Sequence, residues 1–308
     1  MANIADLSII ICTFNRAVYL KDTLSYLLKN QHSGQVEILI VDNNSTDSTR
    51  QIADKYAGKH EGGFFVRYVR ETNQGLSFAR NRGIRETEAP VLLFLDDDIR
   101  VEEDFLETWL TFFKRHPEVW AAGGKIEVQF DDPRPKWLSS YLLPLLGYHN
   151  HGEEIKLYPR KSYPFGGNMA FRRDIFELYG GFKTNLGRIG KKLIASEEKE
   201  FFNRLNEASI RPVYVPDAGI WHRVNHKRLT KEYIRRQATG LGQSLAIRVK
   251  NKSLSGQFSE LSVEAGKWGA SLFLLIFYAV TFRLSKGWML ILFRKWIIEG
   301  FIQYKSQK

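Results

Sequence analysis

The sequence predicts an α/β fold built on a parallel sheet, followed by a helical C-terminal segment. Over residues 1–130, short β-branched and apolar runs alternate with amphipathic stretches, the pattern of parallel strands joined by crossover helices. Of the 308 residues, 44% are hydrophobic and 26% are charged, which excludes a disordered or collagen-like chain. Beyond residue 227 the composition turns helical, basic and then apolar.

The elements can be assigned in chain order. Strands are expected at residues 7–12, 36–41, 65–69, 91–95 and 119–128. A helix after the first strand is indicated by leucines at helical spacing, namely Leu20, Leu24, Leu27 and Leu28. Residues 43–47 supply turn and cap residues for a helix through Ile52 and Tyr56. This half is therefore Rossmann-like.

The periodicity fades from residue 131 to residue 164, which indicates a long irregular excursion. A regular pattern returns at residues 165–171, and Lys231–Lys250 is expected to form a helix. We expect a catalytic domain over residues 1–225 and a basic, apolar helical region over residues 226–308.

The charge is distributed unevenly between these two parts. Residues 1–225 carry 30 basic and 30 acidic side chains, whereas residues 226–308 carry 15 basic and 4 acidic side chains. The net charge of +11 therefore belongs to residues 226–308. A cationic segment of this kind is typical of binding to nucleic acid, of binding to an anionic membrane surface, or of a solvated face.

A single cysteine, Cys12, excludes an internal disulfide and favours a reducing compartment. The short apolar run near the N-terminus leads directly into polar residues, so it is interpreted as a strand and not as a signal peptide. These observations favour a cytoplasmic location.

Three carboxylates, Asp96, Asp97 and Asp98, follow the apolar run at residues 91–95. The carboxyl ends of parallel strands form the ligand-binding edge of open α/β folds. A hard cation such as Mg²⁺ or Mn²⁺ would relieve the repulsion among these side chains. The alternative is a solvated acidic loop that caps the next helix.

Two neighbouring segments add polar groups at this edge. Residues 12–16 lack the glycine pattern of a dinucleotide-binding turn, which excludes dinucleotide oxidoreduction. Asp42 ends the second strand, where it can accept a hydrogen bond from a ligand or form a local Asx turn. In residues 73–84, Gly75 permits close backbone approach and Ala79 and Gly83 allow tight packing, which leaves Arg80 and Asn81 unexplained.

With these motifs in this order, the chain resembles the family 2 glycosyltransferases, inverting enzymes with the GT-A fold. The resemblance spans residues 7–225. It rests on the turn after the first strand, on Asp42, on the helix at 73–84 and on the Asp-x-Asp motif at 96–98. It implies that a nucleotide-sugar donor binds to Thr13, Asn15, Arg16, Asp42, Asn73, Gly75, Arg80, Asp96 and Asp97. It also places Asp98 on the metal and Asp96 toward the ribose.

Two later segments extend the resemblance. Gly166, Gly167 and Asn168 match the family's strand at the donor-sugar and acceptor pocket. Residues 196–204 match the segment that carries the catalytic base, where Glu198 replaces the family's aspartate and Glu197 is the second candidate. The alternative for this segment is an acidic first helical turn favoured by the helix dipole.

His222 resembles the histidine that closes the metal and diphosphate site, and imidazole favours Mn²⁺ over Mg²⁺. The alternative is an ordinary surface or core histidine. The resemblance places Asp42 on the nucleotide base, where its carboxylate suits the N3–H of uracil or of thymine. A UDP-sugar is expected over a dTDP-sugar because UDP donors are the more common, and the expected reaction is a single displacement.

The C-terminal segment is expected to lie on the cell membrane. Residues 268–282 are uncharged and would make a helix of about 22 Å, shorter than a hydrocarbon core of ~30 Å. Cations and tryptophans at the edges of the apolar blocks are typical of interfacial helices on an anionic inner leaflet. This location favours a lipid-linked glycan acceptor in polysaccharide or cell-envelope synthesis. The alternative is packing on the catalytic domain or an oligomer formed through these helices.

Three other classes of protein share part of this pattern. A sugar nucleotidyltransferase can share the sheet and its carboxylates, but it usually carries a glycine-rich, basic loop after the first strand. Residues 13–16 contain no glycine and a single cation. A nucleic-acid binder is disfavoured because the apolar blocks are longer than base stacking needs. A non-catalytic sugar- or nucleotide-binding protein at the membrane would retain the site without turnover.

Overall fold

The computed structural model describes residues 5–160, 162–186, 197–250 and 253–306. The chain forms two compact units. The first comprises Met1–Glu127 and His149–Arg223, and the second comprises Val128–Tyr148 and Val224–Lys308. Residues 128–148 thus group with the C-terminal helices, whereas the expected division placed them in the catalytic domain.

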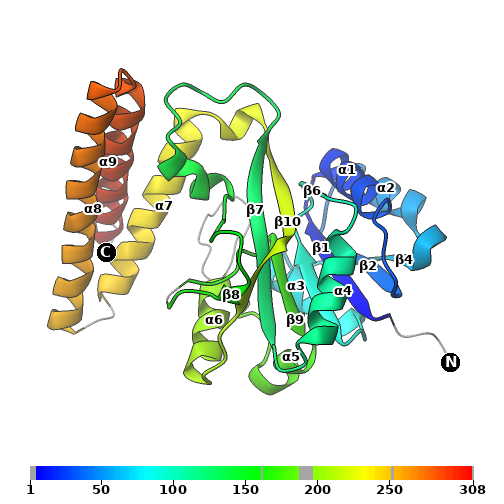
Figure 1. Ribbon diagram of the computed structural model, residues 1–308. Coiled ribbons are helices and arrows are strands. Elements are labelled where there is room, and N and C mark those ends of the chain that lie inside the picture. Colours follow the sequence, from blue (N-terminus) through cyan, green and yellow to red (C-terminus); the bar gives the residue numbers. More distant parts are fainter. Residues whose placement is uncertain (1–4, 161, 187–196, 251–252, 307–308) are drawn as a thin grey trace. The chain divides into compact units, whose positions relative to one another are not determined.

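A ten-stranded mixed sheet runs through the described residues (Figure 1). Nine strands follow the order β3-β4-β2-β1-β5-β9-β7-β10-β6, and β8 pairs with β10. Strands β4, β2, β1 and β5 are parallel, whereas β9 is antiparallel to β5 and β7. The strands are β1 (Leu7–Thr13), β2 (Val36–Asp42), β3 (Gly58–His60), β4 (Phe64–Arg70), β5 (Val91–Leu95), β6 (Ile99–Val101), β7 (Ala121–Phe130), β8 (Lys156–Leu157), β9 (Asn168–Arg172) and β10 (Val213–Val224).

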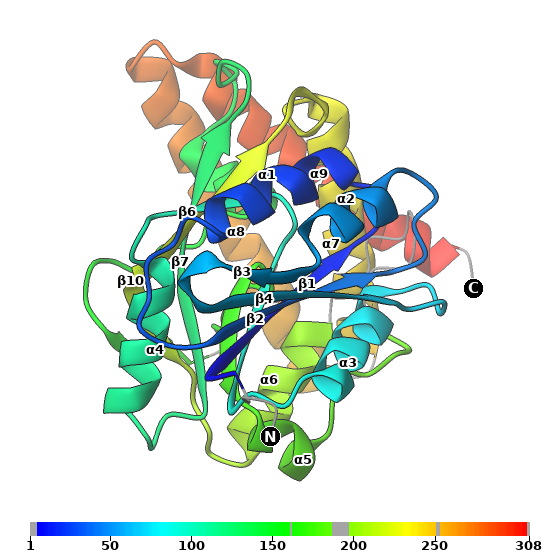
Figure 2. The same ribbon diagram turned by 90° about the vertical axis from the view of Figure 1, so that its right-hand side faces the viewer.

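Helices cover both faces of the sheet in the first unit. Figure 2 shows α1 and α2 on one side of β1 and β2 and α3 on the other. The helices of this unit are α1 (Ala17–Leu27), α2 (Thr49–Tyr56), α3 (Leu76–Glu86), α4 (Phe105–Arg115), α5 (Asp174–Tyr179) and α6 (Glu197–Glu207), with a short 3₁₀ turn at Glu61–Gly63.

The side chains of the central strands alternate between two cores. Ile9 and Ile11 of β1 join the core beneath α1, α2 and α4, whereas Ile10 joins the core beneath α3, α5 and α6. Because side chains of successive residues point to opposite faces of a strand, an apolar run buries both faces. This explains why these strands lack the polar alternation of a half-exposed sheet.

The strands expected from the sequence are all present, with ends shifted by up to two residues. Leu20, Leu24 and Leu27 are buried on α1 as the leucine spacing predicted, whereas Leu28 lies just after the helix and is partly buried. Helix α7 begins and ends at the predicted residues. The short strands β3, β6 and β8 and the long strand β10 were not predicted. The excursion at 131–164 contains a 3₁₀ helix, Ser140–Leu146, and β8.

The expected tight packing of α3 on the sheet is confirmed at Gly83. A methyl group added there would collide with Ile10 Cγ2 of β1, and Ala79 is fully buried one turn earlier. Gly75, immediately before the helix, has a positive φ of 148°, which a residue with a side chain rarely adopts. These small residues bring α3 and its polar side chains against the sheet.

The second unit is mostly helical. It contains a 3₁₀ turn, His226–Arg228, and the helices α7 (Lys231–Lys250), α8 (Leu254–Val280) and α9 (Leu284–Ser306). Figure 1 shows α8 and α9 side by side. Their close approach needs Gly287, where an added methyl group would lie 2.8 Å from the Cα of Leu275. A methyl group on Gly242 of α7 would collide with the Ile297 carbonyl of α9, so small residues hold the three helices together.

Helix α8 is longer than the uncharged run at 268–282 suggested, because its helical turns begin at Leu254. Within the described part of the chain, it alone has the length and apolar composition of a membrane-crossing helix. Most of its apolar part is exposed, including Phe273, Ile276 and Phe277.

Candidate functional site

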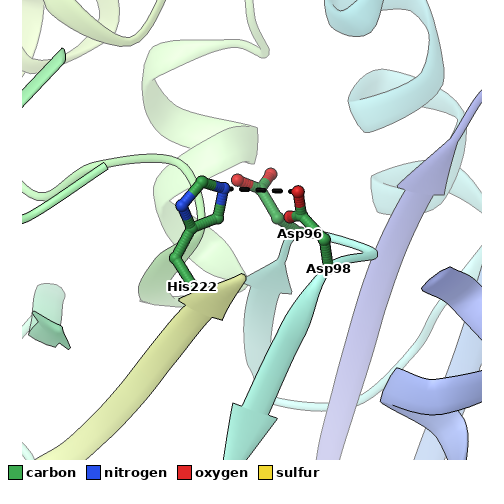
Figure 3. Close-up of side chains that lie close together, drawn as sticks. All are labelled: Asp96, Asp98 and His222. Atoms are coloured by element: carbon green, nitrogen blue, oxygen red, sulfur yellow. Dashed lines mark ion pairs between the residues drawn. The ribbon is translucent and has the colours of Figure 1, made fainter. Parts of the chain in front are cut away.

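Asp96, Asp98 and His222 form a three-residue cluster at the carboxyl edge of the sheet (Figure 3). One ligand atom from each lies within 4.8 Å of the others. The His222 Nε2 atom is 3.3 Å from Asp98 Oδ2, and both residues are buried. The sequence motifs at 96–98 and 222 are therefore neighbours in space.

The register of two strands places His222 in this cluster. Strand β10 runs antiparallel to β6, and His222 is opposite Ile99, the residue after Asp98. The backbone N–H of Arg223 donates to the Asp98 carbonyl at 2.8 Å. Because β6 begins directly after the three aspartates, pairing with β10 brings the histidine to the carboxylates.

The cluster fits a small divalent cation. Two ligands on opposite sides of Mg²⁺, each at about 2.1 Å, are about 4.2 Å apart, so the side chains need only a small adjustment. Carboxylate oxygens suit Mg²⁺ and Mn²⁺, and the imidazole extends the donor set in a way that Mn²⁺ accepts. Among the described residues, Asp96, Asp98 and His222 are thus the side chains that could hold a metal ion. The resemblance implied Asp98 and His222 as ligands and placed Asp96 toward the ribose, whereas the structure brings Asp96 into the same cluster.

Thr13 and Arg16 face the second and third aspartates. The Thr13 hydroxyl donates to Asp97 Oδ2 at 2.6 Å, and Arg16 Nη1 is 3.2 Å from Asp97 Oδ1. Arg16 Nη2 also forms an ion pair with Asp98 Oδ2. Burial raises the pKa of Asp97 to about 7 against the opposing charge of Arg16, and Asp98 and Asp96 add to the increase. These acids therefore depend on a nearby positive charge.

Gly166 and Gly167 lie between the aspartates and the acidic start of α6. A methyl group on Gly167 would be 2.8 Å from Asp96 Oδ2, and one on Gly166 would overlap Glu198 Oε1. A side chain at either position would collide with a carboxylate. The two glycines therefore allow Asp96 and Glu198 to approach the same turn of backbone.

Arg80 pairs with both glutamates at the start of α6. Its Nη1 is 3.0 Å from Glu197 Oε1, and its Nη2 is 2.8 Å from Glu198 Oε1. The side chains of Arg80 and Glu197 are 3% and 2% exposed, whereas Glu198 is 21% exposed. Burial disfavours the charged form of Arg80 and lowers its pKa, but the negative charges of Glu198 and Glu197 outweigh this effect and raise the pKa overall.

The two residues of α3 that packing left unexplained thus have partners. Asn81 donates its amide N–H to the Phe182 carbonyl at 2.7 Å and accepts from the Phe182 N–H at 2.8 Å. The Ser77 hydroxyl donates to the Leu186 carbonyl at 2.8 Å. Helix α3 therefore anchors residues 182–186, and Ser196 of the predicted base segment lies outside the described residues.

Asp42 is buried at the end of β2 and already accepts two hydrogen bonds. Its Oδ1 accepts from the Ser45 N–H at 2.8 Å, and its Oδ2 accepts from the Tyr68 hydroxyl at 2.8 Å. The first bond is the local turn that the sequence offered as the alternative to ligand binding. Both uses are compatible, since each carboxylate oxygen has a second lone pair.

Asn15, Asn73 and Gly75 shape the loops around Asp42. Asn15 has a positive φ of 54° and its Oδ1 accepts from the Thr46 N–H at 2.7 Å. The Asn73 carbonyl and the Gly75 N–H both bond to the Asn43 side chain, each at 2.7 Å. The described hydrogen bonds of the Asn15 and Asn73 side chains go to other loop residues. Contact of these side chains with a nucleotide therefore stays a prediction.

Asn168 is fully buried, and its amide nitrogen donates to the Ala218 carbonyl at 2.7 Å. A weaker bond of 3.3 Å reaches the Lys125 carbonyl. This side chain therefore connects β9 with β7 and with β10 beyond it, and its contact with a sugar stays a prediction.

Sequence reasoning missed several residues around the site. Tyr68 bonds Asp42, and Tyr19 lies under two guanidinium groups, Arg16 at 4.7 Å and Arg223 at 5.4 Å from its ring centre. Asp22 Oδ2 accepts from Arg223 Nη1 at 2.6 Å. The arginine after His222 was visible in the sequence, but nothing local pointed to its partners.

The chain is similar to known glycosyltransferases. A glucosyl-dolichyl phosphate glucuronosyltransferase of Haloferax volcanii is 27% identical over 228 residues, which cover 71% of this chain and 68% of that protein. A cholesterol galactosyltransferase of Borreliella burgdorferi is 28% identical over 196 residues, covering 62% of this chain and 48% of that protein. An uncharacterized glycosyltransferase of Haemophilus influenzae is 30% identical over 212 residues, covering 68% of this chain and 82% of that protein.

The solved structures agree on the fold. A mannosyltransferase from Pyrobaculum calidifontis in complex with GDP-Man and Mn²⁺ matches with a TM-score of 0.63 at 17% identity, covering 100% of this chain and 89% of that one. The described sheet and its helices are accordingly a GT-A fold. The model of the family described as "Glycosyl transferase family 2" matches residues 8–180. Since this match covers more than half of the chain, the protein belongs to glycosyl transferase family 2.

Proposed function

We propose that the protein transfers a sugar from a UDP-sugar to a hydroxyl of a lipid-linked glycan acceptor, with inversion at the anomeric carbon. The observation that carries this proposal is the Gly166–Gly167 turn, which has Asp96 on one side and Glu198 on the other. A donor diphosphate near the aspartates would leave its sugar next to a carboxylate. This is the arrangement that a single displacement requires.

The donor end would be held by the aspartate cluster. Asp96, Asp98 and His222 would hold Mn²⁺ or Mg²⁺, which would neutralise the diphosphate and stabilise it as a leaving group. Asp42 would accept a hydrogen bond from the nucleotide base. The Thr13 hydroxyl orients Asp97 by donating a hydrogen bond to its carboxylate. These side chains bind and orient the donor.

The acceptor end would be served by Glu198. It removes the proton of the acceptor hydroxyl as that oxygen bonds to the anomeric carbon, while the bond from this carbon to the diphosphate oxygen breaks. Arg80 holds the Glu198 carboxylate in place at 2.8 Å. Glu197 is nearly fully buried against the same arginine, so Glu198 is the more accessible of the two and the better base.

A thermal-shift screen of UDP, GDP and dTDP with and without Mn²⁺ tests the donor. We expect UDP with Mn²⁺ to raise the melting temperature most, since ligand that binds the native state stabilises it. Asp98→Asn should abolish the Mn²⁺-dependent part of the shift. A shift in the variant equal to that of the parent protein would contradict the assigned metal site.

The second unit supports attachment to an anionic membrane surface on the cytoplasmic side. Residues 226–308 carry 15 basic and 4 acidic side chains, and α8 exposes Phe273, Ile276 and Phe277. Positive charge near an anionic leaflet contributes about 1 kcal/mol per residue. Two relatives, a glucosyl-dolichyl phosphate glucuronosyltransferase and a cholesterol galactosyltransferase, support a lipid-borne acceptor.

Flotation with phosphatidylglycerol-containing vesicles tests this attachment. Phe273→Glu with Phe277→Glu should reduce binding at least tenfold, since each buried phenylalanine is worth about 1.5–3 kcal/mol. Leu178→Glu, at an exposed apolar position of α5, is the matched control and should float like the parent protein. Unchanged flotation of the double variant, or a dimer that the double variant loses, would favour the oligomer instead.

A further inference from the structure

Arg16 contacts the same carboxylate atom that the candidate metal cluster offers to a cation. Its Nη2 forms an ion pair with Asp98 Oδ2, and His222 Nε2 lies 3.3 Å from that same oxygen. Its Nη1 is 3.2 Å from Asp97. A divalent ion bound to Asp98 would therefore lie close to the Arg16 guanidinium.

Two cations at this distance repel each other. Coulomb energies at a few ångström are large unless water screens them, and Asp97 and Asp98 have only 4% and 1% of their side chains exposed. Arg16 cannot lose its proton. Burial alone would lower its pKa, but the negative charges of Asp97 and Asp98 outweigh burial and raise the pKa. The conflict can be relieved only by movement of the guanidinium or by added negative charge.

The surroundings of Arg16 permit that movement. Its side chain is 27% exposed, and its guanidinium lies 4.7 Å above the ring of Tyr19, which can support a cation independently of the aspartates. A donor diphosphate would bring the missing negative charge to the same place. Arg16 would then have phosphate oxygens as partners in place of Asp98.

We infer that Arg16 competes with the divalent cation for Asp98 and that the diphosphate of the donor relieves this competition. The inference rests on the proposed donor site. Its consequence is an order of binding: the cation binds weakly alone and tightly together with the nucleotide. Arg16 is in this sense a positioning residue that links occupation of the metal site to the presence of donor.

Electron paramagnetic resonance of free Mn²⁺ measures this competition without turnover. We would titrate MnCl₂ into the parent protein, Arg16→Gln, Arg16→Lys and Arg82→Gln, with and without UDP. Arg82, paired with Glu86 on α3, is the matched control. Arg16→Met provides a second neutral variant that can still pack on Tyr19, and circular dichroism checks that each variant folds.

Without UDP, Arg16→Gln should bind Mn²⁺ about tenfold more tightly than the parent, the change given by about 1.4 kcal/mol of relieved repulsion. Arg16→Lys and Arg82→Gln should bind like the parent, and UDP should increase Mn²⁺ affinity less in Arg16→Gln than in the parent. Equal or weaker Mn²⁺ binding by both neutral variants would overturn the inference. Asp98→Asn separates the two proposals. If this substitution leaves Mn²⁺ binding unchanged both in the parent protein and in the Arg16 variants, the metal site itself is overturned.

Discussion

Two acidic clusters in the first unit each pair with an arginine, and the two arginines differ in burial. Arg80 lies between Glu197 and Glu198 with 3% of its side chain exposed. Arg16 lies against Asp97 and Asp98 with 27% exposed. Both arginines compensate buried carboxylates, but only the guanidinium of Arg16 is open enough to solvent to meet a ligand.

The difference separates a fixed ion pair from an exchangeable one. A buried charge whose partner is removed is strongly destabilising, so Arg80 and Glu197 hold α3 and α6 in one arrangement. In the other pair only the guanidinium of Arg16 is partly exposed, whereas Asp97 and Asp98 are buried, so Arg16 can turn toward solvent or a ligand at a smaller cost than Arg80 can. The glutamate cluster is thus suited to hold a proton acceptor in place, and the aspartate cluster is suited to receive a ligand.

The largest expected effect is on turnover at the glutamate cluster. Glu198→Gln should lower kcat by about 10²–10⁴ because the acceptor hydroxyl loses its proton acceptor, while UDP binding is retained. Steady-state kinetics and a UDP titration measure the two quantities separately. If Glu197→Gln lowers kcat by the same factor with no loss of stability, the roles of the two glutamates are interchanged.

The next effect is on stability. Arg80→Met should lower the free energy of unfolding by about 3–5 kcal/mol, since it takes a buried guanidinium away from two carboxylates. Urea denaturation measures it, with Arg16→Met as the comparison, for which a smaller loss is expected. Equal losses in the two variants would remove the distinction between a fixed and an exchangeable pair.

The smallest effect tests the glycine turn between the clusters. Gly166→Ala should destabilise the protein by about 1–3 kcal/mol and lower kcat, because the new methyl group displaces Arg80 or Glu198. Gly269→Ala is the control, since an added methyl group there meets nothing within 4 Å. A Gly166→Ala variant with normal kcat would show that the turn does not position Glu198.

The parallel strands and the helices between them were predictable because their signals are local. Apolar runs marked β1, β2, β4 and β5, and leucine spacing marked α1. Strand β10 was not predicted, because Pro216, Asp217 and Gly219 interrupt its pattern and its pairing with β6 depends on a segment far away in the chain. Strand β6 is too short to show any period.

The order of the motifs identified the family that the comparisons then established, and with it an enzyme. The nucleotidyltransferase and non-catalytic alternatives are therefore no longer needed to explain the motifs.

The roles of individual residues could not be predicted in the same way. Asn81 and Asn15 were polar residues in a motif, and only the fold shows that their side chains secure backbone segments.

Local sequence is enough to establish where carboxylates follow strands, which helix packs closely on the sheet, and that the positive charge belongs to residues 226–308. Periodicity and composition suffice for these properties, because each depends on residues close together in the chain. The folded chain was needed to show that Arg80 joins two glutamates of a distant helix, and that Arg16 and His222 share one oxygen of Asp98. Such pairs depend on strand register and burial, which no short stretch of sequence contains.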